Sequence, residues 1–245
     1  TSRANQIKKI QLDEIKKSTR VYPFIRFNQQ KKVHNKVIEI ESISKSYNEI
    51  SVINKFSTII NSGDRIAIIG GNGIGKTTFL KCLVEDEFIN EGKVKWSENA
   101  QVGYFPQNPS NEFKSNISLL DWMNQWSHEE DDLETVRGTL GRLLFSQNDI
   151  DKPISVLSGG EQRRMLFGKI ILQRANVIIL DEPTNHLDME SIESLNHALN
   201  LFEGTSIFVS HDREFISSLA TRVIEIRHDK IIDYDDNYNN YISKK

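Results

Sequence analysis

The sequence predicts an α/β fold built on a mostly parallel sheet that helices cover on both faces. Two observations lead to this expectation. Apolar, strand-like runs at residues 65–69, 177–180 and 206–209 alternate with helical patterns along the chain. A glycine-rich loop also separates the first run from a segment whose apolar residues, beginning at Phe79, recur at helical spacing.

Charge divides the chain into a basic arm and an acidic body. Residues 1–36 contain ten Lys or Arg and two acidic residues, whereas residues 37–245 contain 21 Lys or Arg and 32 acidic residues. A basic arm is typical of a segment that touches nucleic acid, and equally of a solvated helical linker. Charge alone leaves both interpretations open.

The arm is predicted to be helical and then to dock. Residues 5–19 lack Gly and Pro and carry isoleucines at loosely helical spacing, which predicts a solvent-facing helix that Pro23 ends. We expect Phe24, Ile25 and Phe27 to pack onto the domain that follows. The chain begins at Thr1 without a methionine, so we expect a fragment of a longer polypeptide.

Composition favours a cytosolic protein. The only cysteine, Cys82, cannot form an internal disulfide, and no secretory signal opens the chain. We expect its thiol to be buried and inert. No run of about eighteen apolar residues is present, so direct membrane insertion is not expected.

The glycine-rich loop reads GGNGIGKT and fits the pattern GxxxxGKT in the strand–loop–helix context that this pattern requires. Its glycines let backbone N–H groups turn toward phosphate oxygens at a helix N-terminus. We expect Lys76 to hold the β and γ phosphates of ATP and the Thr77 hydroxyl to bind Mg²⁺. The expected phosphate-binding residues are Gly70, Gly71, Asn72, Gly73, Ile74, Gly75, Lys76, Thr77 and Thr78.

Two carboxylates follow the apolar run at 177–180. Asp181 and Glu182 would lie at the C-terminal edge of a buried strand, where ligands bind in open α/β sheets. Asp181 is suited to the Mg²⁺ shell. Glu182 is suited to orienting or deprotonating an attacking water.

A third element, LSGGE at residues 157–161, directly precedes a helical run. Ser158 and Glu161 have the spacing of a capping box, while Gly159 and Gly160 leave the helix N-terminus open to an anion. Residues 113–150 have helical patterning, with Trp122 and Trp126 predicted on one face as core packing rather than as a ligand cage.

These elements, in this order, resemble the ATP-binding-cassette family of P-loop NTPases over residues 37–245. The resemblance implies a small antiparallel β subdomain and a helical subdomain at about 108–163. It assigns Gln107 to the Q-loop, as a catalytic and Mg²⁺-binding residue, and His211 to the catalytic switch beside Glu182 and Lys76. Tyr47 stands where the family stacks an aromatic ring on adenine. Ser158, Gly159 and Gly160 would contact ATP held by a second such domain, head to tail.

The strings EPTNHLD at 182–188 and SHDREF at 210–215 resemble the ABC-F group in particular. This resemblance implies a cytoplasmic ATPase with two such domains in one chain, whose basic linker, here residues 1–36, reaches the ribosome and tRNA. The alternative is the ATP-binding subunit of a membrane transporter. Such subunits usually start close to their first strand, whereas this chain has some 36 residues before it.

Overall fold

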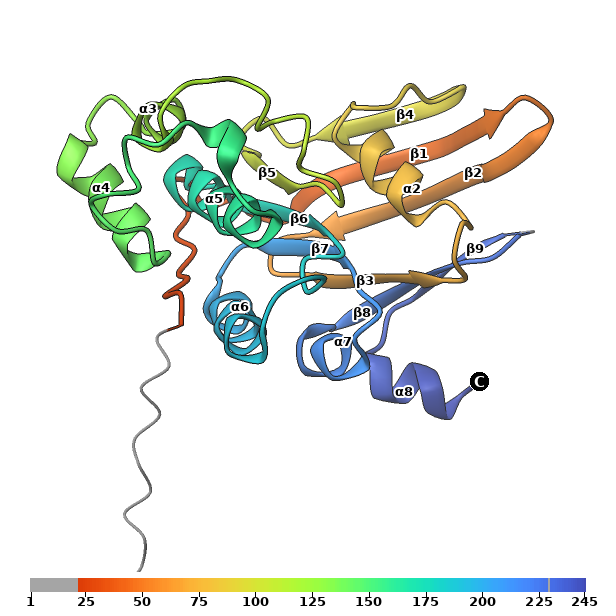
Figure 1. Ribbon diagram of the computed structural model, residues 1–245. Helices are drawn as coiled ribbons and strands as arrows, with labels where there is room; N and C mark the ends of the chain where they lie inside the picture. Colours follow the sequence, from red (N-terminus) through yellow and green to blue (C-terminus); the bar gives the residue numbers. More distant parts are fainter. Residues whose placement is uncertain (1–21, 229) are drawn as a thin grey trace, which may run out of the picture.

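The computed structural model describes residues 22–228 and 230–245 (Figure 1). Its strands are β1 (Lys36–Tyr47), β2 (Ile50–Asn61), β3 (Arg65–Gly70), β4 (Glu91–Trp96), β5 (Val102–Phe105), β6 (Val177–Asp181), β7 (Thr205–Val209), β8 (Arg222–Ile226) and β9 (Ile231–Tyr234). Its helices are α2 (Lys76–Leu83), α3 (Leu119–Asn124), α4 (Leu133–Arg142), the short 3₁₀ helix η1 (Ile154–Val156), α5 (Gly159–Gln173), α6 (Met189–Leu201), α7 (Arg213–Leu219) and α8 (Tyr238–Ser243).

The strands form two sheets. The larger sheet has the order β5-β6-β7-β3-β8-β9, in which only β9 runs antiparallel to its neighbour. The smaller sheet has the order β2-β1-β4 and is antiparallel throughout. A mostly parallel core sheet with a separate antiparallel unit is the fold class that the sequence predicts, and it is confirmed.

The large sheet is covered on both faces, which explains its unbroken apolar strands. In β6, Ile178 and Leu180 pack into a core cluster with residues of α5 and α6. Val177 and Ile179 point the other way, into a cluster with residues of α2, β1 and β2. Successive side chains on a strand point to opposite faces, so a strand between two layers must be apolar at every position.

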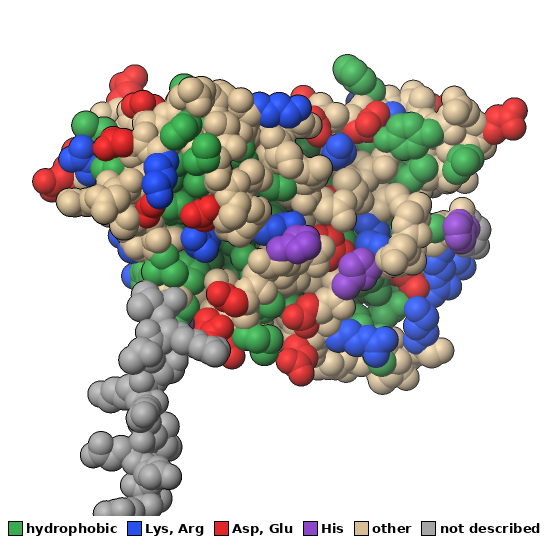
Figure 2. Space-filling view, in the orientation of Figure 1, with side chains coloured by type: hydrophobic (Ala, Val, Ile, Leu, Met, Phe, Trp, Pro, Cys, Tyr) green, Lys and Arg blue, Asp and Glu red, His purple; other side chains and the backbone are tan. Residues whose placement is uncertain are grey.

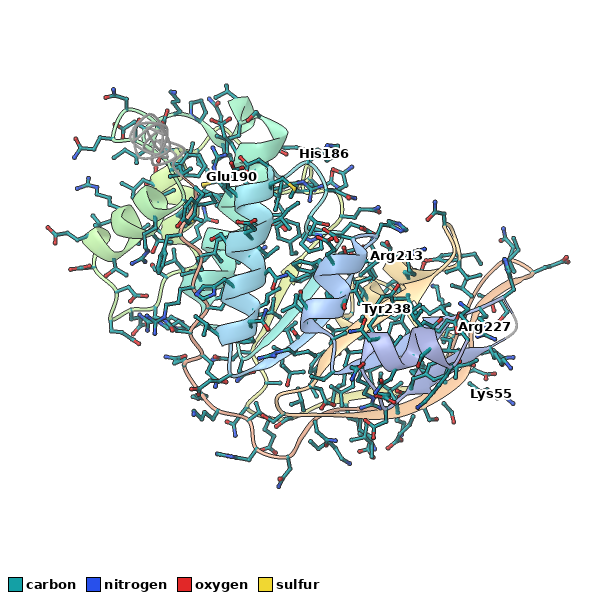
Figure 3. The ribbon with its side chains drawn as sticks, turned by 90° about the horizontal axis from the view of Figure 1, so that it is seen from below. Lys55, His186, Glu190, Arg213, Arg227 and Tyr238 are labelled. Atoms are coloured by element: carbon teal, nitrogen blue, oxygen red, sulfur yellow. The ribbon has the colours of Figure 1, made fainter. Side chains whose placement is uncertain are left out.

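The loops that matter for function leave this sheet at one edge. Because parallel strands end at the same edge, the loops after β3, β5, β6 and β7 come together there. Figure 3 shows α6 and α7 running side by side, with His186 and Arg213 at the same end of the pair. Asp188 and Asp212 cap these two helices by accepting hydrogen bonds from backbone N–H groups of their first turns.

The middle of the chain departs from the prediction. Helix α3 ends at Asn124, so Trp126 lies beyond it and the two tryptophans do not share a helix face. The Ser127 hydroxyl donates to the Asn124 carbonyl at 2.7 Å, and a polar run follows until Asp132 caps α4. Local side-chain hydrogen bonds of this kind compete with helix continuation. The predicted packing is nevertheless correct, since the Trp122 and Trp126 rings touch edge to face and belong to the core.

The helix predicted over residues 5–19 lies outside the described residues, and the docking that follows it is confirmed in part. Ile25 and Phe27 are buried, and Phe27 packs edge to face on Phe202, directly after α6. Phe24 is instead 52% exposed. The segment is extended, so alternate side chains face the domain and Phe24 faces away.

Residues 22–34 form a strap across several elements of the domain. The backbone N–H of Phe24 donates to the Arg142 carbonyl at the end of α4, and that of Gln30 to the Arg174 carbonyl just after α5. The Ser194 hydroxyl of α6 donates to the Pro23 carbonyl at 2.6 Å. This segment therefore touches both the helical region and the helices beneath the sheet.

Two smaller expectations concern the cysteine and the membrane. The thiol of Cys82 is buried as predicted, and this burial raises its pKa to about 11, which keeps it protonated and unreactive at neutral pH. Within the described part of the chain, no helix has the length and apolar character needed to cross a bilayer.

Candidate functional site

The glycine-rich loop connects the end of β3 to the start of α2. It passes so close to its neighbours that side chains are excluded: a Cβ atom on Gly75 would lie 2.1 Å from Cγ1 of Val52, and one on Gly70 would lie 2.5 Å from the carbonyl oxygen of Ile226. Gly75 also has a φ of 111°, in the region that glycine alone adopts without strain. The path of the loop therefore depends on glycine at both positions.

The Lys76 side chain turns back into this loop. Its Nζ donates to the carbonyl oxygens of Gly70 at 3.1 Å and Gly71 at 2.9 Å. Among the hydrogen bonds of the described residues, none has a backbone N–H of residues 71–75 as its donor. Free N–H groups around an ammonium, at the start of a helix, form a cradle that fits phosphate oxygens.

Asp181 is the last residue of β6 and has an exposed fraction of 0%. Neither of its carboxylate oxygens has a hydrogen-bond partner within the described chain. Burial raises the pKa of Asp181, and this is opposed by the Thr77 hydroxyl, in a contact looser than a standard hydrogen bond, and by the Lys76 charge. A buried, unpartnered carboxylate beside a hydroxyl fits a hard cation such as Mg²⁺.

The surroundings fit an ion that arrives with a nucleotide. Thr77 and Gln107 line one hollow of about 890 Å³. Over residues 22–228 and 230–245, no group of three or more His, Cys, Asp or Glu residues could hold a metal ion by itself. Mg²⁺ commonly takes one or two carboxylates and completes its shell with water and substrate phosphates.

Glu182 follows directly and is also buried. The backbone N–H of His211 donates to its Oε2 at 3.2 Å, and His211 Nε2 lies 3.1 Å from Oε1 but out of line for a hydrogen bond. Burial raises the pKa of Glu182, the His211 ring and backbone N–H lower it, and the neighbouring Asp181 charge raises it further. A carboxylate whose pKa is shifted toward neutrality, beside an imidazole, is suited to accepting a proton.

The LSGGE element forms the start of α5. The Ser158 hydroxyl accepts from the Glu161 N–H, and Glu161 Oε2 accepts from the Ser158 N–H at 2.8 Å, which confirms the capping box. A Cβ atom on Gly159 or Gly160 would meet nothing within 4 Å, so this helix end is open. In the part of the chain that the structure describes, no hydrogen bond or ion pair joins residues 158–161 to the loop at 70–78.

The structure therefore brings Lys76, Thr77, Asp181, Glu182 and His211 to one sheet edge and leaves the LSGGE element unconnected to them. Tyr47 ends β1 and is 43% exposed, with Lys45 Nζ 4.7 Å from its ring centroid. One face of this ring thus already carries a cation.

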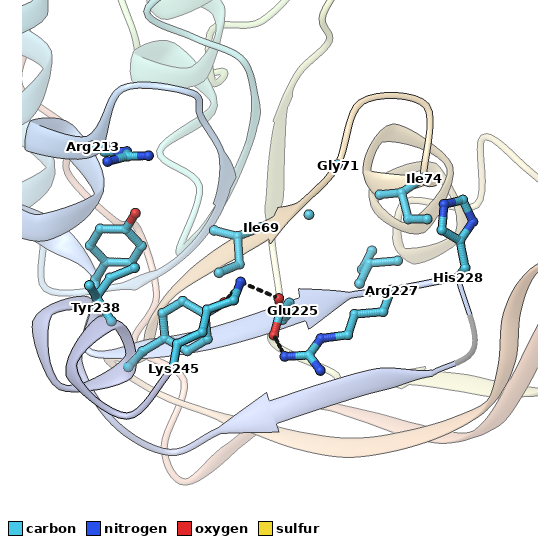
Figure 4. A pocket seen from close by; sticks show the side chains of 13 residues that line it. Ile69, Gly71, Ile74, Arg213, Glu225, Arg227, His228, Tyr238 and Lys245 are labelled. Atoms are coloured by element: carbon cyan, nitrogen blue, oxygen red, sulfur yellow. Dashed lines mark hydrogen bonds and ion pairs between the residues drawn. The ribbon is translucent and has the colours of Figure 1, made fainter.

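A second hollow, of about 690 Å³, is lined in part by Gly70 and Gly71. Within it, the Glu225 carboxylate accepts hydrogen bonds from Arg227 and Lys245 (Figure 4). Figure 2 shows Lys and Arg side chains gathered at the lower right of the molecule. Gly70, Gly71 and Ile74 of the loop line this hollow, whereas Lys76, Thr77, Asp181 and Glu182 do not, so the charged groups of the candidate site converge elsewhere.

Two buried polar contacts at the site edge involve residues to which the sequence assigned no role. The Thr184 and Ser210 hydroxyls lie 3.3 Å apart, and Ser210 Oγ also accepts from the Asp212 N–H. The Arg163 side chain reaches from α5 to the loops after β5 and β6. The strings at 182–188 and 210–215 contain Thr184 and Ser210 but do not show that they meet, and the reach of Arg163 depends on the fold.

Comparison with known families agrees with this geometry. The family model described as ABC transporter matches residues 53–185, which is more than half of the chain and includes the phosphate loop, the LSGGE element and the Asp181–Glu182 pair. The chain belongs to the ABC transporter family. It is an ATP-binding domain of that family, as the sequence predicts.

Relatives of this ABC domain include proteins labelled as the F group. The chain is 53% identical over 245 residues to "Probable ATP-binding protein YbiT" of Escherichia coli O157:H7, covering all of this chain and 46% of that protein. It is 36% identical over 221 residues to "ABC transporter F family member 5" of Arabidopsis thaliana, covering 90% of this chain and 32% of that one. The chain thus spans less than half the length of these relatives.

Solved structures show the same fold at low identity. A bacterial Atm1-family ABC exporter with ATP bound superimposes with a TM-score of 0.74 at 15% sequence identity, covering 89% of this chain and 42% of that one. At this identity the likeness concerns the fold alone.

Proposed function

We propose that this ABC domain binds ATP with Mg²⁺ and hydrolyses it to ADP and phosphate. The observation that supports the proposal most is the meeting, at one sheet edge, of the phosphate loop, the unpartnered Asp181 and the Glu182–His211 pair. Each group alone has structural explanations. Together they supply phosphate donors, an oxygen site for a cation and a proton acceptor.

Each candidate residue has one role in this proposal. The N–H groups of residues 70–78 and the Lys76 ammonium bind and neutralise the phosphates, while Thr77, Gln107 and Asp181 hold Mg²⁺, which spreads the developing negative charge when bound. Glu182 orients a water for attack on the γ-phosphorus and accepts its proton as the bond to the β-phosphate oxygen breaks. His211 fixes the Glu182 carboxylate, and Tyr47 stacks on adenine.

The site is completed by a second ABC domain. The open N-terminus of α5, with Ser158, Gly159 and Gly160, has no connection to its own phosphate loop and suits an anion presented by another molecule. In this proposal two domains close head to tail, and each covers the nucleotide held by the other. The unit that does so comprises residues 37–245, with a helical subdomain at about 108–163.

Dilution tests the composite site. One copy of the chain binds Mg-ATP but needs a second copy to hydrolyse it, and association costs several kcal/mol of lost translational and rotational freedom. ATPase activity per molecule should therefore be low and should rise across a hundredfold increase in concentration, with Glu182→Gln as the background control. High specific activity that does not change with concentration would contradict the composite site.

We further propose that the whole protein is a cytosolic, ribosome-associated factor of the ABC-F group. The ten basic residues of the arm at 1–36, in a chain that is otherwise acidic, support this proposal together with the F-group relatives. An arm that binds RNA through phosphates gives an affinity that falls steeply with salt.

Ribosome sedimentation of the full-length protein tests the arm. Replacing Lys8, Lys9, Lys16 and Lys17 together by Gln should weaken co-sedimentation and flatten its salt dependence, by about 0.7 to 0.9 in log–log slope for each phosphate that the arm no longer neutralises. Unchanged binding of the quadruple variant at every salt concentration would show that the arm is only a spacer.

A further inference from the structure

The Arg163 side chain is buried beneath two loops of the candidate site. Only 4% of this residue is exposed, although it lies in the first turns of α5, directly after the capping box. Its Nη1 donates to the carbonyl oxygen of Glu182 and its Nη2 to that of Gln107, both at 3.3 Å. One planar group thus spans the loops that follow the neighbouring strands β5 and β6.

Fold stability alone does not explain an arginine at this position. Arg163 forms no ion pair with a carboxylate of the described residues; burial lowers the pKa of its guanidinium, and the Glu182 charge opposes this only in part. A buried cation without an ion-pair partner stabilises a fold less than an apolar side chain of similar volume. The apolar setting is otherwise well packed, since the guanidinium lies 5.7 Å from the ring centroid of Phe105, which itself stacks on Phe167.

The backbone that Arg163 holds is strained. Glu182 has a φ of 51°, in the left-handed region that non-glycine residues adopt only at an energetic cost. Its N–H donates to the Val209 carbonyl at 3.0 Å, and its own carbonyl accepts from Arg163 and from the Asn185 N–H. The direction of the Glu182 carboxylate depends on this backbone conformation.

We infer that Arg163 is a positioning residue, which fixes the backbones of Glu182 and Gln107 relative to each other for catalysis. This inference rests on the proposed ATPase function for its catalytic consequence. The start of α5 would then have two roles. Arg163 holds loops of its own domain, and the open N-terminus contacts the nucleotide that the second domain holds. A planar, two-pronged donor can hold two carbonyls at once, which a lysine ammonium does with less geometric control.

Two substitutions separate positioning from stability. Arg163→Met removes both donors and keeps an apolar stem, and Arg163→Lys keeps the charge. Arg222→Met is the matched control, because Arg222 is also largely buried and pairs with Asp64 and Asp233 at the start of β8, away from the strand ends that carry the site.

Hydrogen exchange measures how firmly the two loops are held, and it does not require ATPase activity. In Arg163→Met the amides of residues 105–112 and 181–188 should exchange at least tenfold faster, while the same peptides in Arg222→Met keep the wild-type rate. Unchanged exchange of both peptides in Arg163→Met would overturn the inference, whatever the ATPase activity.

Steady-state kinetics measure the effect of Arg163 on catalysis. A displacement of about 1 Å can cost a hundredfold in rate, so Arg163→Met should lower kcat about a hundredfold and change KM for ATP by less than threefold. Arg163→Lys should stay at least tenfold below wild type. A kcat of Arg163→Met within threefold of wild type would refute the catalytic role. Faster exchange in a protein whose wild type has no ATPase activity would instead refute the proposed function and leave the positioning intact.

Discussion

Replacing Asp181 by Asn should make the nucleotide-free domain more stable. The carboxylate is fully buried and neither of its oxygens accepts a hydrogen bond among the described residues. Asn keeps the shape of the side chain and removes the charge. A residue that destabilises the fold on its own and is useful only with a ligand is the expected signature of a binding site.

The magnitude follows from this environment. An unsatisfied buried polar group costs about 1 to 3 kcal/mol, and a charged group costs more. The attraction of Asp181 to Lys76, which the variant loses, works in the opposite direction. We therefore expect a gain of about 1 to 3 kcal/mol, which for a domain of this size is roughly 2 to 12 °C in melting temperature.

The stability gained by Asp181→Asn should increase from acid to neutral pH. Burial raises the pKa of Asp181 above its ordinary value of 3.8, so the folded state holds the proton more tightly than the unfolded state does. The wild-type domain has this stability in full below pH 3.8 and loses it as the pH rises through the folded pKa. The gap between Asp181→Asn and wild type should thus be small in acid and largest at neutral pH.

Thermal unfolding with and without Mg-ATP measures both effects. A ligand at a hundred times its Kd stabilises by about 2.7 kcal/mol, and Asp181→Asn should lose the part of this that depends on Mg²⁺. A variant that is less stable than wild type without nucleotide at pH 7 would refute the reasoning from the unpartnered carboxylate.

Four further predictions concern the same site and its surroundings. Lys76→Ala should abolish the rise in melting temperature on adding ATP, because the ammonium in the loop is removed, and a retained rise would contradict the loop assignment. Glu182→Gln should bind ATP but lose at least about a hundredfold in turnover. Since the pKa of Glu182 is raised, wild-type ATPase activity should fall on the acid side at a pH above the ordinary pKa of 4.5, and a flat rate profile down to pH 4.5 would argue against Glu182 as the base. Phe27→Ala should cost about 3 to 5 kcal/mol in urea unfolding, and a loss below 1 kcal/mol would show that the strap does not anchor there.

The sequence was informative where the determinants are local. The strand–loop–helix around Lys76 and the capping box of Ser158 and Glu161 depend on residues only a few positions apart, and both are found where the pattern predicts them. The exposure of Phe24 was not foreseen, because the direction of an extended segment across a domain depends on what it packs against. Arg163 could not be foreseen either, since its partners are 19 and 56 positions away in the chain.

The strap at residues 22–34 limits how the domain can change shape. It is hydrogen-bonded at one end to the last turn of α4 and to α6, and further along to the carbonyl that follows α5, while the Lys31 carbonyl accepts from Asn176 beside β6. Any rotation of the helical region against the large sheet must break some of these bonds or carry the strap with it. The strap therefore couples these regions mechanically, because a rotation of α4 relative to α6 is transmitted directly to residues 22–24.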